Sequence, residues 1–352
     1  MLFYDVVLMG YYGYSNLGDD LLFLTTLEII SKHSSIRNVF VPAPKRLEQL
    51  RKLFPGNLNI KIVNRYNPIT IYRTINKSDA TIFGGGNLFQ DETSNRSFLY
   101  YYFTAKHTLS MGHPLILLSQ GFGPVRNSKN LQRLDTVINS PLTYGLLRDR
   151  NSFHYASKNS DNFTFSVDYG PLFLMNELEN VKQIRDNKMA TIVLKTGVRV
   201  NEIVKILKDK GIEKIFVTGF QNHREEALIE SSSLQVQKSG MKILRTSNNW
   251  KDIILNICNS RIVITERLHG ALLSLFFGVP FIWLKGKKLD EVISSTIDNY
   301  KLSYSSEKGD LSEIIDKAMK IEDLEEASEK YKTHLKKTKQ KALEMLRDAL
   351  NE

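Results

Sequence analysis

The chain has 352 residues, of which 42% are hydrophobic and 24% are charged, and its formal net charge is +10. This is the composition of a globular protein long enough for two domains, and it excludes a largely disordered chain. A basic surface attracts anions of several kinds, but the sequence contains no helix-turn-helix, zinc-finger or RNA-recognition pattern, so nucleic-acid binding is not predicted.

The sequence carries no recognisable targeting or membrane-spanning segment. The N-terminal stretch MLFYDVVLMGYY has no basic residues before its apolar run, and Asp5 interrupts that run, so no signal peptide is expected. The longest uncharged run, 268–284, is shorter than a membrane span and contains Gly and Pro. The single cysteine, Cys258, fits a reducing compartment. We therefore expect a cytoplasmic protein, and its basic charge is compatible with work at the inner membrane face.

Apolar strands alternate with amphipathic helices through the first half of the chain. Strands are predicted at 4–10, 38–43, 60–65, 80–86, 114–121, 144–149 and 163–168. Helices are predicted between them, at 19–33, 45–54, 68–78, 95–112 and 128–140. Continuous apolar strands that alternate with helices indicate a parallel sheet covered on both faces, and right-handed crossovers make such a sheet doubly wound.

The alternation of strands and helices stops after Asp168 and then resumes. Residues 169–190 are mixed in character and are predicted to be a linker, and a second strand–helix series occupies 191–320. The fold class is therefore α/β, with two Rossmann-like doubly wound domains, 1–168 and 191–320. We expect them to face a cleft at the carboxyl ends of both sheets, where open α/β sheets bind ligands.

Residues 321–352 are predicted to form a C-terminal helix. Leu335, Ala342, Leu346 and Leu350 share one face at helical spacing, so this face should pack on a domain. The lysines of the helix either face solvent or contact an anionic membrane surface.

The stretch GYYGYSNLGDD, residues 10–20, follows the first predicted strand. Its glycines allow a tight turn, but its spacing is neither a dinucleotide fingerprint nor a Walker loop. Asn16 and Asp19 stand near the start of the next helix, where they either cap it or bind a ligand.

Two further strand ends of the first domain carry glycines and polar side chains. In IFGGGNLFQDETSNRS, Gly85 and Gly86 suit close approach of a ligand to the backbone, and Asn87 and Gln90 add hydrogen-bonding groups. The alternative is an unusual turn. In LLSQGFGPV, Gln120 ends a strand before a Gly-Phe-Gly-Pro turn.

An arginine follows another strand of the first domain, in the stretch LLRDRNS. Arg148 would lie near the predicted cleft, and a guanidinium binds a carboxylate or phosphate in bidentate fashion. The alternative is an ion pair between Arg148 and either Asp149 or Asp168.

The second domain contains RIVITERLHGALLSLFFGVPFIWL, in which an apolar strand ends in polar residues. His269 would occupy the first turn of a helix, whose positive end favours a neutral imidazole. Such a group can both take and give protons. Glu266 and Arg267 beside it strengthen the prediction of a functional site.

Taken together, these motifs resemble those of the polysaccharide pyruvyl transferase family. The matching pieces are GYYGYSNLGDD, GGGNLFQD, SQGFGP, LLRDRNS, VDYGP and ERLHGALLSLFFGVP, in order over residues 4–284. The resemblance implies a glycosyltransferase-B-like fold. It also implies transfer of pyruvate from phosphoenolpyruvate to two hydroxyls of a sugar, which leaves a cyclic ketal.

The resemblance also implies roles for particular residues. Arg148 and His269 fall on the family's donor-contacting positions, and a lysine after the Gly-Val-Pro turn contributes in relatives. Lys285, Lys287 and Lys288 stand there, of which Lys288 is the preferred candidate. The chain departs from the family pattern in having Asp20 where glutamate is expected, and VDYGP where Asp-Pro is commoner, which weakens any role for Asp168.

The predicted site divides into two sets of residues. His269, as general acid and base, and Arg148 are the catalytic candidates. The donor-binding set comprises Arg148, Arg267, His269, Gly270 and Lys288. The acceptor-binding set comprises Asn16, Asp19, Gly85, Gly86, Asn87, Gln90 and Gln120.

Neither a metal nor a cofactor is expected, with phosphoenolpyruvate serving as co-substrate and a sugar, lipid-linked or not, as acceptor. The main alternative is a glycosyltransferase of the same architecture that uses a nucleotide-sugar donor. A two-lobed sugar-binding protein is a second alternative, which the absent signal peptide disfavours.

Overall fold

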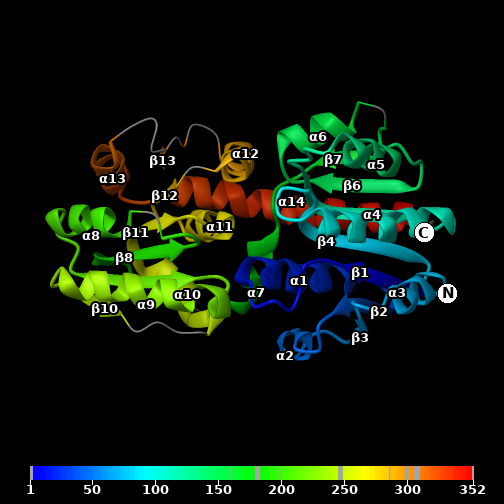
Figure 1. The fold of residues 1–352 in the computed structure, drawn as a ribbon, viewed down its shortest axis with the longest axis horizontal. Helices are drawn as coiled ribbons and strands as arrows, with labels where there is room; N and C mark the ends of the chain where they lie inside the picture. Colours follow the sequence, from blue (N-terminus) through cyan, green and yellow to red (C-terminus); the bar gives the residue numbers. More distant parts are fainter. Residues whose placement is uncertain are drawn as a thin grey trace. The chain divides into compact units, whose positions relative to one another are not determined.

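The computed structural model describes residues 3–158, 160–178, 183–197, 199–244, 249–284, 286–297, 300, 302–304 and 310–350 (Figure 1). The chain divides into two compact units. Unit 1 contains residues 1–14, 19–173 and 334–352, and unit 2 contains residues 15–18 and 174–333. Each unit is built around one parallel sheet.

Unit 1 holds a seven-stranded sheet in the order β3-β2-β1-β4-β5-β6-β7, and each described pair of neighbours is parallel. The strands are β1 (Tyr4–Met9), β2 (Ile36–Ala43), β3 (Asn59–Asn64), β4 (Ala80–Phe89), β5 (Leu115–Phe122), β6 (Thr143–Leu147) and β7 (Phe163–Phe165). The strand order reverses between β1 and β4, which is the switch point at which doubly wound sheets bind ligands.

The helices of unit 1 are α1 (Leu17–Ile30, of which the first two residues belong to unit 2), α2 (Leu47–Arg51), α3 (Pro68–Ile75), α4 (Asn95–Ser110), α5 (Ser128–Ile138) and α6 (Arg150–Ala156). Helices α3 to α6 each begin at a residue whose side chain caps the helix. Asn67 caps α3 and Ser94 caps α4, each by accepting a hydrogen bond from a backbone N–H of the first turn. Asn127 and Asp149 do the same for α5 and α6.

A hydrophobic cluster of unit 1 lies between the sheet and helices α3 to α6. It contains Val7 and Phe83 from the strands and Phe98 and Leu134 from the helices, all 0–1% exposed. A short 3-10 turn, Gly170–Phe173, ends the central part of the unit.

Unit 2 holds a six-stranded sheet in the order β10-β9-β8-β11-β12-β13. The strands are β8 (Asp186–Leu194), β9 (Lys214–Gly219), β10 (Lys242–Leu244), β11 (Ser260–Thr265), β12 (Phe281–Leu284) and β13 (Ser303–Tyr304). Its helices are α7 (Leu174–Glu177), α8 (Val200–Asp209), α9 (Asn222–Lys238), α10 (Trp250–Asn259), α11 (Leu268–Phe276), α12 (Lys287–Thr296) and α13 (Leu311–Met319). The switch point lies between β8 and β11, so residues that follow these two strands stand at the edge expected to bind ligands.

The last helix, α14 (Glu325–Ala349), divides between the units after Thr333. Its predicted apolar face is confirmed, because Leu335, Ala342, Leu346 and Leu350 are at most 4% exposed. Two of its lysines serve unit 1: Lys339 forms an ion pair with Glu28, and Lys341 donates to the carbonyl of Phe165.

The two-domain doubly wound fold with a C-terminal helix is confirmed, but its details differ from the prediction. The division falls between residues 173 and 174, and β8 already begins inside the predicted linker at Asp186, since the strand opens with polar residues that hide its start. The strands and helices predicted within 191–320 ended at Leu284, so α12, β13 and α13 were missed. Among the described helices, none is both long and apolar enough to cross a membrane.

Candidate active site

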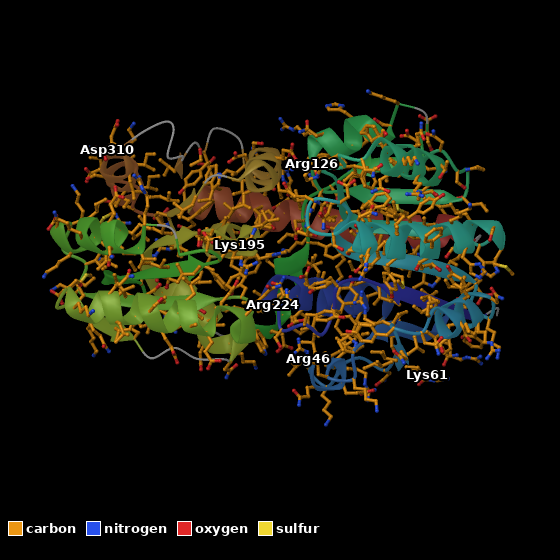
Figure 2. The ribbon with its side chains drawn as sticks, in the orientation of Figure 1. Arg46, Lys61, Arg126, Lys195, Arg224 and Asp310 are labelled. Carbon is orange, nitrogen blue, oxygen red and sulfur yellow. The ribbon has the colours of Figure 1, made fainter. Side chains whose placement is uncertain are left out.

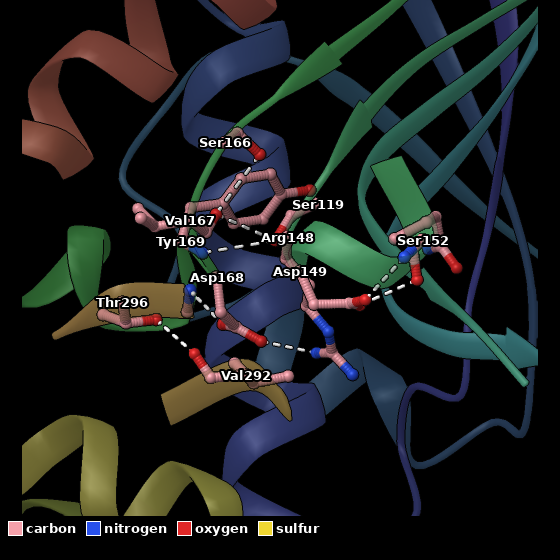
Figure 3. Close-up of polar contacts among 12 residues, drawn as sticks. Ser119, Arg148, Asp149, Ser152, Ser166, Val167, Asp168, Tyr169, Val292 and Thr296 are labelled. Atoms are coloured by element: carbon pink, nitrogen blue, oxygen red, sulfur yellow. Dashed lines mark hydrogen bonds and ion pairs between the residues drawn. The ribbon is translucent and has the colours of Figure 1, made fainter. Parts of the chain in front are cut away.

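Arg148 follows β6 and is the largest fully buried side chain of the described residues. It is 1% exposed, and its Nη1 donates to Oδ2 of the fully buried Asp168 over 2.5 Å (Figure 3). Asp168 also accepts the backbone N–H of Gly170 at 3.0 Å. Of the two ion pairs proposed as alternatives for Arg148, the one with Asp168 is present, and it fixes one edge of the guanidinium.

Asp149 and Ser152 form a second network beside Arg148 (Figure 3). Asp149 Oδ1 accepts the Ser152 backbone N–H, and Asp149 Oδ2 accepts the Ser152 hydroxyl, each at 2.8 Å. The Ser152 hydroxyl in turn accepts the Phe122 backbone N–H at 2.8 Å. The aspartate and serine of the LLRDRNS stretch therefore tie the start of α6 to the end of β5 and hold the loop that carries Arg148.

Gly121, near the end of β5, leaves room for three polar groups. A Cβ at this position would lie 2.8 Å from Asp149 Oδ2, 3.3 Å from Arg148 Nε and 3.5 Å from Asn87 Oδ1. We call Asn87, Gly121, Arg148 and Asp149 the Arg148 cluster. Sequence reasoning missed Gly121, although the turn signal in LLSQGFGPV pointed to this strand end.

Two polar atoms of the Arg148 cluster are buried without a partner. Arg148 Nε and Asn87 Oδ1 form no hydrogen bond within the described part of the chain. The Asn87 amide nitrogen donates to the carbonyl of Gly123, which orients the side chain. A buried unpaired polar group costs about 1–3 kcal/mol, so such a group at a sheet edge is a candidate ligand contact.

Gln120, predicted on the acceptor side, also lies at this edge. Its side chain is fully buried and donates to the Phe83 carbonyl at 3.5 Å, while Oε1 has no partner among the described residues. Gln90 differs, because it bonds to both the backbone and the hydroxyl of Thr93 and so closes its own turn.

The triple glycine within β4 has a packing explanation. A Cβ on Gly84 would lie 2.5 Å from the Tyr12 hydroxyl, and one on Gly85 would lie 2.6 Å from Leu22. Gly85 and Gly86 have φ values of +79° and +108°, which other residues rarely adopt. The glycines lie within the strand and not in the turn considered as an alternative, packing accounts for Gly84 and Gly85, and contact of Gly85 or Gly86 with an acceptor stays a prediction.

The start of α1 contains a carboxyl group that sequence reasoning did not single out. Burial, together with the neighbouring charge of Asp19, raises the pKa of Asp20 to about 7. A group that titrates near neutral pH in the first turn of a helix beside a sheet edge is a candidate for proton transfer. Burial is the largest cause of this shift, and burial cannot be read from the sequence.

The segment 15–18 of the opening loop packs within unit 2. Asn16 pairs with Gln221 in an antiparallel bridge, and the Leu17 backbone N–H donates to the Phe220 carbonyl at 3.1 Å. A Cβ on Gly18 would lie 2.1 Å from His269 Nδ1. The glycine thus allows the imidazole to lie directly against the backbone. Asp19, by contrast, belongs to unit 1.

Glu266, directly after β11, fills a nest of backbone donors. Its carboxylate accepts the N–H groups of Lys195, Thr196 and Gly197 at 2.7–3.0 Å, as well as the Thr196 hydroxyl. Burial alone would raise the pKa of Glu266, but these hydrogen bonds hold it below its usual range. The polar residue that seemed out of place after an apolar strand therefore organises the loop after β8.

Arg267 forms an ion pair with Glu225, which is 5% exposed, and its Nε donates to the Leu194 carbonyl at 3.4 Å. Glu225 is itself held by the Gln221 backbone N–H at 2.8 Å. Arg267 was predicted to bind the donor, but its guanidinium contacts Glu225 and the Leu194 carbonyl inside unit 2. Its contact with a donor stays untested, and the geometry favours a positioning role.

His269 is the second residue of α11 and is partly exposed. Gly270 beside it would place a Cβ 2.2 Å from the Thr265 hydroxyl, so this glycine lets α11 pack closely on the end of β11. The side chain of Lys288 lies outside the described residues, as do those of Lys285 and Lys287. Within the described ranges, no three His, Cys, Asp or Glu side chains gather as a metal site would require.

The fold is similar to that of solved sugar-nucleotide enzymes. UDP-N-acetylglucosamine 2-epimerase from Rickettsia bellii matches with a TM-score of 0.64 and 12% identity, over 100% of this chain and 97% of that chain. The Neisseria meningitidis enzyme, solved bound to UDP-GlcNAc, matches with a TM-score of 0.62 and 13% identity, over 97% and 99%. At this identity the likeness shows the glycosyltransferase-B-like fold alone.

Sequence comparison is more specific about the family. No curated protein matches the chain. The profile of the family described as polysaccharide pyruvyl transferase matches residues 16–287, well over half of the chain, and this range contains the Arg148 cluster, Glu266 and His269. The chain therefore belongs to the polysaccharide pyruvyl transferase family.

Proposed function

We propose that the chain transfers the pyruvyl group of phosphoenolpyruvate to two hydroxyls of a sugar in a cell-surface polysaccharide or its precursor. The observation that carries the proposal is membership of the family, whose match spans both predicted catalytic residues. The acceptor is thus a polysaccharide or a unit of one. A lipid-linked acceptor and contact of the basic surface with an anionic membrane are further parts of the proposal.

The reaction balances without a further reactant. The methylene carbon of phosphoenolpyruvate gains a proton and becomes a methyl group, while a sugar hydroxyl attacks the adjacent carbon and loses its proton. Phosphate leaves with the bridging oxygen. The second hydroxyl then attacks the same carbon and gives its proton to phosphate, which closes the ketal. One group must therefore deliver and accept protons, and one cation must hold the anionic donor.

Arg148 is the proposed donor-binding cation. Asp168 holds its Nη1 edge, while Nε has no partner among the described residues and stands close to Gly121, where no side chain intervenes. A carboxylate or phosphate oxygen that accepts from Nε would satisfy this buried donor, and a charge-assisted hydrogen bond of this kind is among the stronger ones.

His269 is the proposed general acid and base. It is partly exposed at the start of α11, and both neighbouring polar residues are engaged elsewhere, Glu266 in its backbone nest and Arg267 with Glu225. These contacts fix the backbone on which the imidazole stands and leave His269 as the group of this stretch suited to moving a proton.

The test is to incubate the protein with phosphoenolpyruvate and a panel of glycosides. We expect release of phosphate together with a mass gain of one pyruvyl ketal on the acceptor. His269→Ala should lower turnover by about 10²–10⁴-fold, because general acid–base catalysis contributes that much, with an unchanged melting temperature. Near-normal turnover by this variant would remove His269 from the mechanism, and no ketal on any glycoside would count against the proposed reaction.

A second candidate is a glycosyltransferase that uses a nucleotide-sugar donor. It is favoured by the likeness to structures solved with UDP-GlcNAc and with UDP. Thermal unfolding in the presence of phosphoenolpyruvate or of UDP-sugars separates the two candidates, because only a ligand that binds the folded state raises the melting temperature. Stabilisation by a UDP-sugar alone would favour the second candidate.

A further inference from the structure

A cluster of tyrosines and arginines lies at the other half of the carboxyl edge of the unit 1 sheet. Tyr11 and Tyr14 follow β1, Arg46 follows β2, and Arg65 and Tyr66 follow β3. Together with Tyr100 of α4 they form what we call the tyrosine platform. None of the proposed chemistry uses it, and Figure 2 shows Arg46 beside α2, which follows the same strand end.

The rings and cations of the platform are stacked. Tyr11 and Tyr14 have ring centroids 4.3 Å apart at an interplanar angle of 13°. The Arg65 guanidinium lies 5.2 Å from the Tyr14 ring and 5.0 Å from the Tyr100 ring, and Arg46 lies 5.8 Å from Tyr14. The Tyr14 and Tyr66 hydroxyls are 2.9 Å apart. Cation–π contacts of this kind hold the guanidinium planes in place without using all of their donors.

Two features of the platform are not explained by packing. Tyr66 is 71% exposed, although it is an aromatic residue fixed by a hydrogen bond to Tyr14. In addition, Arg65 Nη1 and the Tyr100 hydroxyl are buried without hydrogen-bond partners in the described ranges. Burial raises the pKa of Tyr100 to about 12, so its hydroxyl keeps its proton at neutral pH. An exposed ring beside unsatisfied donors suits a ligand that has an apolar face and several hydroxyls.

The platform lies far from Arg148 along the sheet edge. Neighbouring strands are about 4.8 Å apart, so the ends of β1 and β3 stand roughly 14 and 24 Å from the end of β6, which Arg148 follows. The platform would thus hold a part of the acceptor remote from the reacting hydroxyls.

We propose that Tyr14, Arg65, Tyr66 and Tyr100 form a remote acceptor subsite that stacks a sugar ring of an oligosaccharide, one or more units away from the sugar that receives pyruvate. This inference rests on the proposed function for the identity of the ligand. It implies that the enzyme prefers acceptors of several sugar units to single sugars.

The test measures binding without turnover, so that it does not depend on the transfer reaction. The probes are tetrasaccharides of glucose, galactose and mannose and the corresponding methyl monosaccharides, titrated by ligand-observed NMR. We expect at least one tetrasaccharide to bind more tightly than its monosaccharide. Tyr66→Ala should weaken that binding about tenfold, the loss expected for one aromatic contact of about 1.4 kcal/mol.

Two further variants sharpen the test. Arg65→Lys keeps the charge but removes the planar guanidinium, so it should also weaken the tetrasaccharide. Phe3→Ala is the matched control, because Phe3 is 55% exposed but precedes β1 at the opposite edge of the sheet, and it should bind as the wild type does. The proposal is overturned if no tetrasaccharide binds, or if Tyr66→Ala binds the tetrasaccharide with wild-type affinity.

Turnover distinguishes failure of the subsite from failure of the proposed function. If ketals form, Tyr66→Ala should raise the KM for an oligosaccharide acceptor and leave unchanged both the KM for phosphoenolpyruvate and the activity on a monosaccharide. Equal effects on both acceptors would overturn the remote subsite while the proposed reaction stands. If sugar binding depends on Tyr66 but no ketal forms, the proposed reaction is contradicted and the proposed subsite is retained.

Discussion

Both units place an arginine shortly after a strand at the carboxyl edge of the sheet, Arg148 after β6 and Arg267 after β11, but they treat its charge differently. Arg148 is almost fully buried and meets Asp168 along one edge, while its Nε has no partner among the described residues. Arg267 is 16% exposed, and both its Nη2 and its Nε are used inside unit 2. An arginine after a strand is therefore a ligand-binding candidate only when its acidic partner leaves donors unused.

The same contrast appears in the neighbouring acids. In unit 1, Asp149 caps α6 and bonds to Ser152, which holds the Arg148 loop against β5. In unit 2, Glu266 accepts hydrogen bonds from the loop after β8 and so supports a different strand end. The acid next to the arginine makes structural hydrogen bonds in both units, and the group that we propose for chemistry is the guanidinium in unit 1 and the imidazole in unit 2.

The largest expected effect is the difference in stability loss when the arginine of each ion pair is replaced. Arg148→Met removes the guanidinium that pairs with the buried Asp168 and should lower the free energy of unfolding by about 3–5 kcal/mol in urea titrations. Arg267→Met should cost less, because water reaches this pair more easily. The double variant Arg148→Met/Asp168→Leu should recover most of the stability but no turnover. Equal losses for the two single variants would break the comparison.

A smaller effect is expected from the glycine beside the imidazole. Gly18→Ala places a methyl group 2.1 Å from the present position of His269 Nδ1, so the ring must move. Turnover should fall by up to about 10²-fold, because small displacements of a catalytic group are costly. Alanine favours a helix over glycine by about 1 kcal/mol, so the stability loss should be modest.

A double variant tests whether Gly18 acts through the imidazole. Gly18→Ala should have no further effect on turnover in the His269→Ala background, since both changes act on the same group. Full additivity of the two losses would show that Gly18 contributes in another way, and the positioning role would then be rejected.

The smallest effect concerns the acid of unit 2. The folded-state pKa of Glu266 is lowered, so its ionised form stabilises the fold at neutral pH, and this contribution is lost as the pH falls below the ordinary value of 4.5. Glu266→Gln should reduce the free energy of unfolding by about 1 kcal/mol at pH 7, since solvent screens the partly exposed carboxylate. The difference from the wild type should shrink towards pH 3, as melting temperatures across pH would show. A gap that grows in acid would contradict this assignment.

Much of the fold could be predicted because hydrophobic periodicity and the residues that cap helices or form turns are local properties of the sequence. The strands of unit 1 were predicted close to their observed bounds, since continuous apolar runs between capped helices allow few other interpretations. The start of β8 was missed because Asp186, Asn187 and Lys188 are polar, and their place in the ladder depends on pairing with residues far along the chain. The C-terminal helix was predicted, but not its division between the units.

The candidate site was predicted less completely. Strand-end placement and family resemblance led to Arg148 and His269, but the roles of their neighbours depended on contacts with distant residues. Gly85 was assigned to an acceptor because three glycines suggest an open backbone, whereas Leu22 of α1 occupies the space that a Cβ would need. The tyrosine platform was not predicted at all, since its members come from three separate strand ends and one helix.

By itself, the sequence determined the two doubly wound sheets, the apolar face of the last helix and the family, because hydrophobic periodicity and short motifs act over few residues. Only the tertiary structure decided which charges are paired, that Asp168 rather than Asp149 holds Arg148 and that Glu225 holds Arg267. Only the tertiary structure also brought the Gly18 backbone against the imidazole. Pairing and burial follow from how segments that are distant in the sequence pack together, and no local pattern of residues determines that packing.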